Sequence, residues 1–213
     1  SIGLDQDRVS DIDFDYAIFT NITRDHLDYH GNFENYLKSK AKFFENLKDD
    51  KIAVINADDT NAPYFTERAK SKVVTFGFKR GNLVGNVLRN SGKGFNLRIE
   101  GMGRDVEVFS PLVGGFNAWN VLAAASVGIL ENLSDSEIKE RIANAPLPPG
   151  RLERVESAEG VTVFVDYAHT PDALFSVISS LKEYNPARII TVFGAGGHRD
   201  TGKRGSMGAV VSA

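Results

Sequence analysis

The chain has 213 residues, of which 42% are hydrophobic and 25% are charged, so its composition is that of an ordered globular protein. Its 25 Lys and Arg and 28 Asp and Glu leave a net charge of -3, which argues against nucleic acid or an anionic membrane as a partner. No apolar run reaches the ~18–20 residues that a membrane span needs. The absence of cysteine excludes disulfides, thiolate metal sites and a cysteine nucleophile, and it fits a reducing cytoplasm, where we expect the protein.

The first third of the chain alternates between apolar runs and stretches with helical spacing of apolar residues. We expect strands at 16–20, 52–55 and 73–76 and helices at 33–47 and 64–69. Asn32 stands where the first of these helices needs an N-cap. This alternation is typical of an α/β fold with a parallel sheet.

The texture changes between Gly81 and Phe109, where short β-like runs are joined by glycine-containing turns. This pattern predicts a small antiparallel insert. A helix is expected from Asn117 to Leu130. Ser134 and Glu137 then form a capping-box start for a shorter helix.

Residues 145–150 form the best linker candidate, because three prolines in four positions are incompatible with a helix or a central strand. Beyond it we expect a strand at 161–165, a helix at 171–184 and a strand at 189–193, which together make one βαβ unit. We therefore divide the chain into domains at 1–148 and 149–213. The chain opens without a methionine and ends in a helix-like stretch, so we expect it to be part of a longer protein.

The segment 25–30 reads D-H-L-D-Y-H and places His26 and His30 four residues apart. In a helix both imidazoles would share a face, as zinc ligands do. The zinc-protease pattern needs Glu directly after the first His, however, and Leu27 stands there. Taken alone, the segment is best interpreted as a capped turn with exposed polar groups, and a single metal-binding His is the alternative.

Lys40 falls on the apolar stripe of the predicted 33–47 helix. The usual explanation is a lysine whose stem packs while its ammonium reaches water. The alternative is a lysine whose head enters a site, because a buried amine loses its charge readily and can then react with carbon dioxide to form a carbamate. That modification would turn a cation that repels metal into an anion that binds it.

Asn117 and Asn120 lie three residues apart at the start of a predicted helix. Two amides on one helix face can read a base edge by paired donor and acceptor contacts. For Asn117 alone, N-capping is the favoured interpretation.

Two polar segments follow predicted strands of the second domain, V-D-Y-A-H-T-P at 165–171 and F-G-A-G-G-H-R-D at 193–200. Ligands bind at the carboxyl ends of parallel strands, and glycines there admit an anion close to backbone N–H groups. The glycine spacing does not match the dinucleotide fingerprint, and the chain contains no G-x-x-x-x-G-K-[S/T] loop. On their own, the residues indicate an α/β protein that handles a nucleotide or another anion.

Taken together, the motifs and their order resemble the Mur ligases, closest to the branch that adds the third residue of the peptidoglycan peptide. The motifs that bear the resemblance are T-N-x-x-x-D-H-L-D-Y-H-G at 20–31, Lys40, N-A-D-D at 56–59, F-N-x-x-N at 116–120, G-R-x-E at 150–153, D-Y-A-H-T-P at 166–171 and G-x-G-G-x-R-D-x-x-K-R at 194–204. The resemblance runs from Ser1 to Ala213. It implies an α/β fold: an incomplete ATPase-type central domain with a parallel or mixed sheet, followed by the start of a Rossmann-like C-terminal domain.

The resemblance also implies an activity, ATP-dependent amide formation in peptidoglycan biosynthesis. ATP activates the terminal carboxylate of a UDP-N-acetylmuramoyl dipeptide as an acyl phosphate, and the amine of a diamino acid, meso-diaminopimelate or L-lysine, displaces the phosphate. The implied cofactors are ATP and Mg²⁺, which stabilise the charge that develops. We expect a cytoplasmic monomer with no nucleic-acid partner and no membrane insertion.

Roles for single residues come from the same resemblance. His26 corresponds to a Mg²⁺ ligand and Lys40 to a carbamylated lysine that supports a second metal, and these two are the expected catalytic residues. The implied nucleotide contacts are Asn117, Asn120, Arg151, Asp166, Tyr167 and His169. Gln6 and Arg8 match contacts to the UDP-sugar peptide. Arg199 matches a contact to the carboxylate of the incoming amino acid.

Several parts of the family pattern are not found in these 213 residues: the uridine-binding domain, the phosphate-binding loop, a metal-binding glutamate and the motif that selects the amino acid. We therefore expect the chain to hold about half of a composite site. A cyanophycin-type ligase or a folylpolyglutamate synthetase is the alternative within the same superfamily. A non-catalytic fragment with residual nucleotide affinity is the alternative of a different class.

Overall fold

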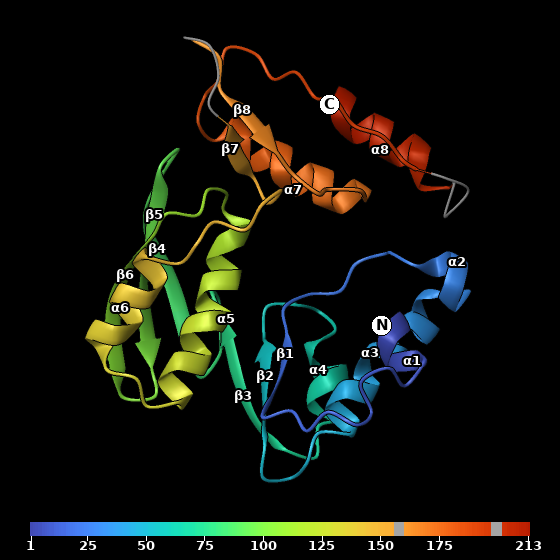
Figure 1. Cartoon of the computed structure of the whole chain (residues 1–213), viewed down its shortest axis with the longest axis vertical. Coiled ribbons are helices and arrows are strands. Elements are labelled where there is room, and N and C mark those ends of the chain that lie inside the picture. The colour runs from blue at the N-terminus through green and yellow to red at the C-terminus, as the bar shows by residue number, and fades with distance from the viewer. Residues whose placement is uncertain (156–159, 197–201) are drawn as a thin grey trace.

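The computed structural model describes residues 1–155, 160–196 and 202–213. Its main feature is a six-stranded sheet whose strands lie in the order of the sequence (Figure 1). The strands are β1 (Tyr16–Phe19), β2 (Ile52–Asn56), β3 (Lys72–Gly77), β4 (Leu83–Ser91), β5 (Gly94–Gly101) and β6 (Arg104–Ser110). The first four pair in parallel, β3 and β4 through two residue pairs only, and the last three pair antiparallel. The predicted α/β class with a mixed sheet and an antiparallel insert is confirmed.

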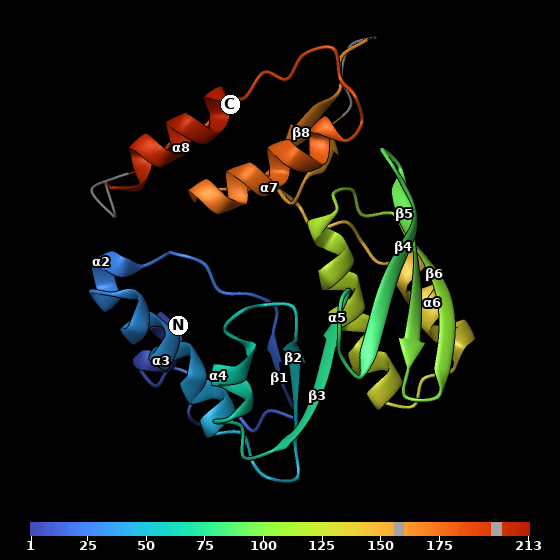
Figure 2. The same cartoon turned by 180° about the vertical axis from the view of Figure 1, so that it is seen from behind.

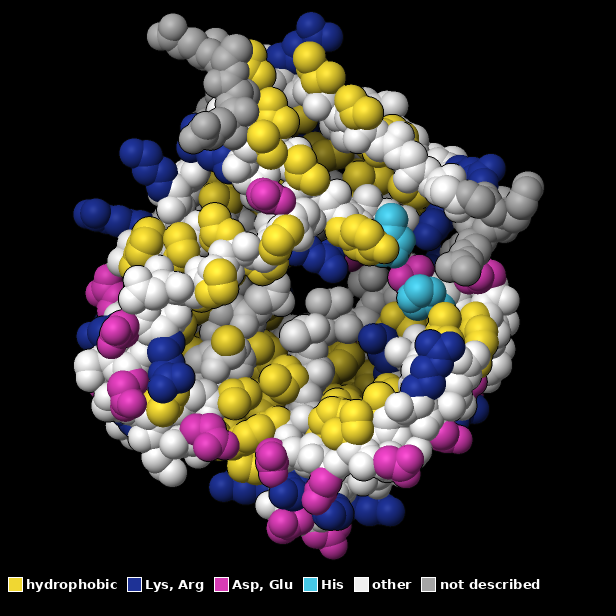
Figure 3. Space-filling model, viewed as in Figure 1, with side chains coloured by type: hydrophobic (Ala, Val, Ile, Leu, Met, Phe, Trp, Pro, Cys, Tyr) yellow, Lys and Arg dark blue, Asp and Glu magenta, His cyan; other side chains and the backbone are white. Residues whose placement is uncertain are grey.

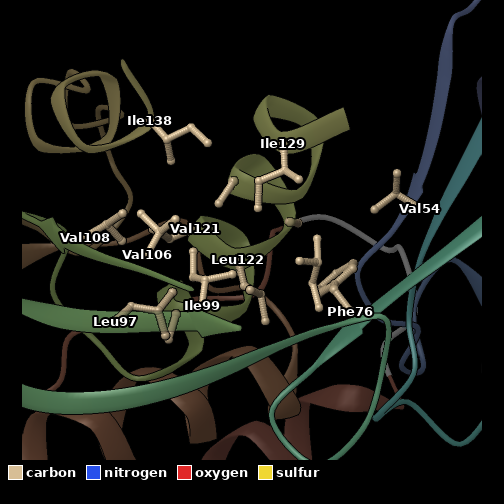
Figure 4. Close-up of a cluster of buried hydrophobic side chains, with 14 of the residues drawn as sticks. Val54, Phe76, Leu97, Ile99, Val106, Val108, Val121, Leu122, Ile129 and Ile138 are labelled. Atoms are coloured by element: carbon tan, nitrogen blue, oxygen red, sulfur yellow. The ribbon is translucent and has the colours of Figure 1, made fainter. Parts of the chain in front are cut away.

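Helices cover both faces of the sheet. The helices within residues 1–148 are α1 (Ile2–Asp5), α2 (Leu27–His30), α3 (Phe33–Glu45), α4 (Ala62–Thr66), α5 (Phe116–Leu130) and α6 (Asp135–Ala143). In β2, Ala53 and Ile55 pack in one core with α3 and α4, whereas Val54 packs in another with α5. Figure 4 shows this second core, in which α5 and α6 side chains meet those of β5 and β6. Burial on both faces explains why β2 reads as an unbroken apolar run.

Local signals at the helix starts behave as expected. The Asn32 side chain accepts a hydrogen bond from the Asn35 amide at 2.8 Å and caps α3. Ser134 and Glu137 form the predicted capping box of α6. The short helix α4 begins two residues earlier than predicted because Pro63 falls in its first turn, where a missing N–H costs nothing.

The part of the chain after the proline segment is smaller and differs from its prediction. It contains β7 (Glu153–Val155), β8 (Val163–Val165), α7 (Pro171–Lys182) and α8 (Lys203–Ser212). The strands β7 and β8 pair with each other antiparallel. The predicted strand at 189–193 is wrong for this structure: Ile190 is 73% exposed and Val192 95%, and the segment forms no strand pairing with the rest of the described chain. Without a neighbouring strand to satisfy its backbone groups, an apolar run does not become a strand.

The smaller part (the described residues of 149–213, called the C-terminal part below) lies across one end of the larger part (1–148, the central part), as the two opposite views show (Figures 1 and 2). At the tip of the β4–β5 hairpin, Nδ2 of Asn90 donates to Glu183 Oε2 at 2.8 Å, and the Tyr184 hydroxyl donates to Asn90 Oδ1 at 3.2 Å. Residues 145–150 between the parts form neither helix nor strand, as predicted. None of the described helices is long and apolar enough to span a membrane.

Candidate functional site

The loop that follows β1 is held by the N-A-D-D segment that follows β2. Asn56 donates through Nδ2 to the Thr20 carbonyl at 2.7 Å, and Asp59 accepts from the Ile22 amide at 3.1 Å. Asp58 turns the other way and accepts from the Phe78 amide at 2.6 Å. The N-A-D-D motif therefore ties together the loops at the carboxyl ends of the parallel strands, and it positions the residues that lead to His26.

Asp25 is the centre of a cluster of basic groups at this edge of the sheet. Its Oδ2 lies 3.3 Å from Nε2 of His26 and 3.7 Å from Nε2 of His169, and its Oδ1 lies 3.9 Å from Nζ of Lys203. His26 belongs to the central part, whereas His169 and Lys203 belong to the C-terminal part. Figure 3 shows basic, acidic and histidine side chains around the hollow between the two parts.

His26 and His30 do not act as a pair on one helix face. His26 has a left-handed backbone (φ 54°) and precedes α2, which is a single turn. His30 is buried, and its ring centre lies 5.4 Å from that of Tyr36. Its Nε2 has no hydrogen-bond partner among the residues that the structure describes. Burial lowers the pKa of His30, so the neutral ring is favoured there. His30 is thus a core residue, whereas His26 lies in the turn before α2 and, of the two histidines, is the one that contacts Asp25.

Lys40 on α3 is half-buried. Its ammonium lies 5.4 Å from the centre of the Tyr36 ring, and its side chain lines a cavity of about 100 Å³ together with residues of α1, α3 and the loop after β1. Burial lowers the pKa of Lys40, and the nearby Asp25 carboxylate opposes this in part. Lys40 forms no ion pair with any other residue that the structure describes. These observations favour the interpretation in which the lysine head enters a site over the one in which it reaches water.

The side chains near His26 do not match what Mg²⁺ requires. No group of three or more His, Asp or Glu side chains converges as a metal site within residues 1–155, 160–196 and 202–213. Mg²⁺ prefers oxygen ligands, but His26 offers a nitrogen, an unmodified Lys40 offers a cation, and the carboxylate beside them, Asp25, is surrounded by basic groups. The unmodified set therefore does not form a magnesium site.

The two predicted adenine-side asparagines contact each other at the start of α5. Asn117 is buried, donates through Nδ2 to the Val113 carbonyl at 2.7 Å, and accepts from Nδ2 of Asn120 at 3.0 Å. Asn120 is exposed. Since the N-cap of α5 is Gly115, the N-capping interpretation of Asn117 is wrong.

The four predicted nucleotide contacts in the C-terminal part lie close together at the start of that part. The Arg151 guanidinium lies 5.1 Å from the centre of the Tyr167 ring, and Nδ1 of His169 lies 2.9 Å from the Tyr167 carbonyl oxygen. Asp166 accepts from the amides of Leu152 and Ala168 at 2.7 and 2.8 Å. Both carboxylate oxygens of Asp166 therefore accept hydrogen bonds from backbone amides, and Asp166 positions the backbone at Leu152 and Ala168.

The remaining predicted residues lie elsewhere. Gln6 and Arg8 are exposed after α1. Asp7 and Val9, next to them in the chain, line a hollow of about 670 Å³ between the 7–14 segment and the end of α3. Neither Gln6 nor Arg8 lines it, and neither do the predicted catalytic and nucleotide-binding residues. Arg199 lies outside the described residues.

The sequence predicts no role for Asp25 or Lys203, although both lie inside motifs that carry the family resemblance. Their neighbours in the sequence were the one available indication of a role: Asp25 directly precedes His26, and Lys203 lies near the end of the glycine-rich motif. What brings them together is the placement of α8 beside the loop after β1, which no spacing in the sequence reveals.

The chain is similar to known proteins in both sequence and fold. A relative from Parabacteroides distasonis, UDP-N-acetylmuramoyl-L-alanyl-D-glutamate–2,6-diaminopimelate ligase, is 41% identical over 210 residues, which are 97% of this chain and 42% of that protein. A solved structure of a ligase of the same name has a TM-score of 0.72 at 32% identity and covers 98% of this chain and 44% of its own. A MurF ligase from Thermotoga maritima in complex with ADP, with a TM-score of 0.66 at 23% identity over 79% of this chain and 39% of its own, shares the fold.

The chain therefore spans less than half the length of these relatives. The sequence profile of the Mur ligase middle domain matches residues 1–128, and that of the Mur ligase glutamate ligase domain matches residues 150–213. Because the first profile alone covers more than half of the chain, the protein belongs to the Mur ligase family.

Proposed function

We propose that the complete protein containing these residues is an ATP-dependent ligase that adds a diamino acid to UDP-N-acetylmuramoyl-L-alanyl-D-glutamate. The observation that supports this most strongly is the 41% identity, over 97% of the chain, to a ligase named for 2,6-diaminopimelate. We therefore take meso-diaminopimelate as the substrate to test first and L-lysine as the competing one. The proposal includes a cytoplasmic monomer, a central domain at 1–148 and a C-terminal domain at 149–213.

The proposed reaction joins a carboxylate to an amine in two steps. A carboxylate oxygen of the dipeptide attacks the γ-phosphorus of ATP, the bond to the β-phosphate oxygen breaks, and ADP leaves. The amine of the diamino acid then attacks the acyl carbon, loses a proton and displaces inorganic phosphate. Both steps build negative charge on oxygen, which nearby cationic and hydrogen-bonding groups stabilise.

In this proposal, residues of this chain bind and orient the substrates. Asn120, held by Asn117, presents an exposed amide to the adenine. Arg151, Tyr167 and His169 face the nucleotide from the C-terminal part. Gln6 and Arg8 contact the UDP-sugar peptide, and Arg199 contacts the carboxylate of the diamino acid.

Lys40 supports the proposal through its environment. A lowered pKa favours the neutral amine, which can attack carbon dioxide and lose a proton to give a carbamate anion. With that anion in place, His26 and Lys40 would hold Mg²⁺, which supplies charge stabilisation when it is bound.

The test uses the complete reading frame that encodes these residues. The purified protein is incubated with the UDP-sugar dipeptide, ATP, Mg²⁺ and either meso-diaminopimelate or L-lysine, and the products are separated and weighed by mass spectrometry. We expect one ADP for each tripeptide formed, with meso-diaminopimelate preferred. The exposed-pair variant Asp105→Asn serves as a matched control, and no tripeptide with either amino acid would contradict the proposal.

A further inference from the structure

Asp25 is the one carboxylate in the cluster described above, and it faces basic side chains of both parts of the chain. We propose that Asp25 is a positioning residue that holds the C-terminal part closed over His26 and Lys40, through its contacts with His169 and Lys203. The contact itself does not depend on the proposed function; only its effect on the rate of ligation does.

The first argument is that Asp25 organises its own loop. Its Oδ1 accepts a hydrogen bond from the His26 amide at 2.9 Å, and His26 has the left-handed backbone that non-glycine residues adopt only when the surroundings hold them there. The carboxylate is therefore fixed in direction before the C-terminal part approaches. A preorganised partner loses less conformational freedom when a contact forms.

The second argument is that the two basic side chains, His169 and Lys203, come from separate elements of the C-terminal part. His169 lies in the loop before α7, and its Nδ1 lies against the Tyr167 carbonyl, which leaves Nε2 facing Asp25. Lys203 is the first residue of α8. One carboxylate thus contacts both the loop that leads to α7 and the start of α8, so it fixes the orientation of the C-terminal part as well as its distance.

The third argument is partial burial. The Asp25 side chain is 20% exposed and that of Lys203 is 14% exposed, whereas the surface pair between Arg98 and Asp105 is about half exposed. Charges that are shielded from water are screened less by salt and interact over longer distances. The 3.9 Å separation between Asp25 and Lys203 therefore still carries an attraction, whereas the His169 side chain, at 3.7 Å, is 47% exposed and contributes mainly through its position.

A second set of contacts joins the parts on another side, where the Asn90 side chain meets Glu183 and Tyr184. Both are hydrogen bonds to the neutral amide of Asn90 and do not involve Asp25. They define a pivot that stays in place when the Asp25 contacts break, so the proposal predicts a change of separation at one side only.

The experiment uses the 213-residue chain, whose lack of cysteine allows clean attachment of spin labels. Labels at Lys38→Cys on α3 and Ala209→Cys on α8, both exposed positions, report the separation across the Asp25 side. Labels at Lys93→Cys and Lys182→Cys, also exposed, report the pivot side. Pulsed electron–electron resonance gives the distance distribution for each pair in the unmodified chain, in Asp25→Asn, in Asp25→Glu and in the control Asp105→Asn.

We expect Asp25→Asn to move the Lys38–Ala209 distribution to longer distances, with the ratio of closed to open molecules falling about fivefold. Asp25→Glu should restore part of the short-distance population, and Asp105→Asn should leave it unchanged. The Lys93–Lys182 distribution should stay the same in all variants. An unchanged first distribution in Asp25→Asn, or equal broadening of both, would overturn the proposal.

Circular dichroism first checks that Asp25→Asn is folded. If it is not, the same measurement on the chain that retains Asp25, with sodium chloride raised from about 0.05 M to about 1 M, takes its place, because salt weakens the ion pairs without a substitution. If the fraction of molecules with the short distance does not change with the salt concentration, the proposal is overturned. In the complete enzyme Asp25→Asn should lower kcat about tenfold and raise the KM for ATP, because opening the C-terminal part moves Arg151, Tyr167 and His169 away from the nucleotide. If the unmodified enzyme makes no tripeptide, the proposed function fails while the distance measurement still decides the contact.

Discussion

Asn117 holds the side chain of Asn120 by accepting a hydrogen bond from its Nδ2 at 3.0 Å, while its own Nδ2 is bound to the Val113 carbonyl. The two amides of the F-N-x-x-N motif thus form a chain that runs from the buried backbone to the surface. Asn117 is 6% exposed and Asn120 is exposed. The motif therefore divides into a supporting residue and a residue free to contact a ligand.

This division predicts different effects of two alanine substitutions in the complete enzyme. Asn120→Ala should raise the KM for ATP about fivefold with little change in stability, because it removes one hydrogen-bonding group from the surface. Asn117→Ala should lower the free energy of unfolding by about 1–3 kcal/mol, because it leaves the part-buried Val113 carbonyl without its partner. Steady-state kinetics and urea unfolding separate the two effects. Equal loss of stability in both variants would show that Asn120 is structural.

The buried amine of Lys40 predicts a pH-dependent contribution to stability. Burial lowers the pKa of Lys40 in the folded chain, so between that value and the ordinary ~10.4 the unfolded chain holds a proton that the folded chain has lost. Stability should therefore rise with pH through this window, and at lower pH the folded chain bears the full cost of the buried charge. Lys40→Met should stabilise the chain by about 1 kcal/mol near pH 7 and by less near pH 10. Lys38→Met, at an exposed position on the same helix, is the control, and urea unfolding at both pH values is the measurement.

The carbamate proposed for Lys40 has a separate test in the complete enzyme. Lys40→Ala should lose most of the activity, and short carboxylates such as acetate or propionate should restore part of it, because they place an anion where the carbamate would be. The same additions should not help Asn120→Ala. Near-normal kcat in Lys40→Ala would instead support a lysine that only packs its stem.

The proline segment before Gly150 predicts a rigid-body movement. Prolines limit φ on one side, whereas Gly150 (φ +66°) adopts a left-handed backbone that favours glycine. We expect the radius of gyration of the complete enzyme to fall when an ATP analogue and the UDP-sugar dipeptide are added together, with each domain unchanged internally. Small-angle scattering measures this change. An unchanged radius of gyration at saturating ligand would show that the proline segment only connects the two domains and is not a hinge.

The 213-residue chain by itself should not turn over ATP. It contains no G-x-x-x-x-G-K-[S/T] loop, and that loop supplies the backbone N–H groups and the lysine that hold the β- and γ-phosphates. ADP release by the purified chain with a full substrate set is the measurement, compared with a heat-inactivated sample. Release above that background would contradict the prediction.

The order of the elements in the central part was predictable because each has a local cause. The apolar run of β2, the Asn32 cap and the Ser134–Glu137 capping box act within a few residues, so they are legible in the sequence. The predicted strand at 189–193 failed for the opposite reason. A strand exists only when a neighbour pairs with its backbone, and its own apolar residues do not supply that neighbour.

For the candidate site, the sequence by itself determined the family resemblance, the residue types and the unusual place of Lys40 on an apolar stripe. Only the tertiary structure decided which of these residues meet. His26, His169 and Lys203 lie far apart along the chain, and the fold brings all three to Asp25. Tertiary packing also decided that His30 is core while His26 is not, because burial depends on how α2 lies against α3. Residue spacing reports which side chains share an element, whereas the strength of electrostatic and hydrogen-bonding interactions depends on distances between elements.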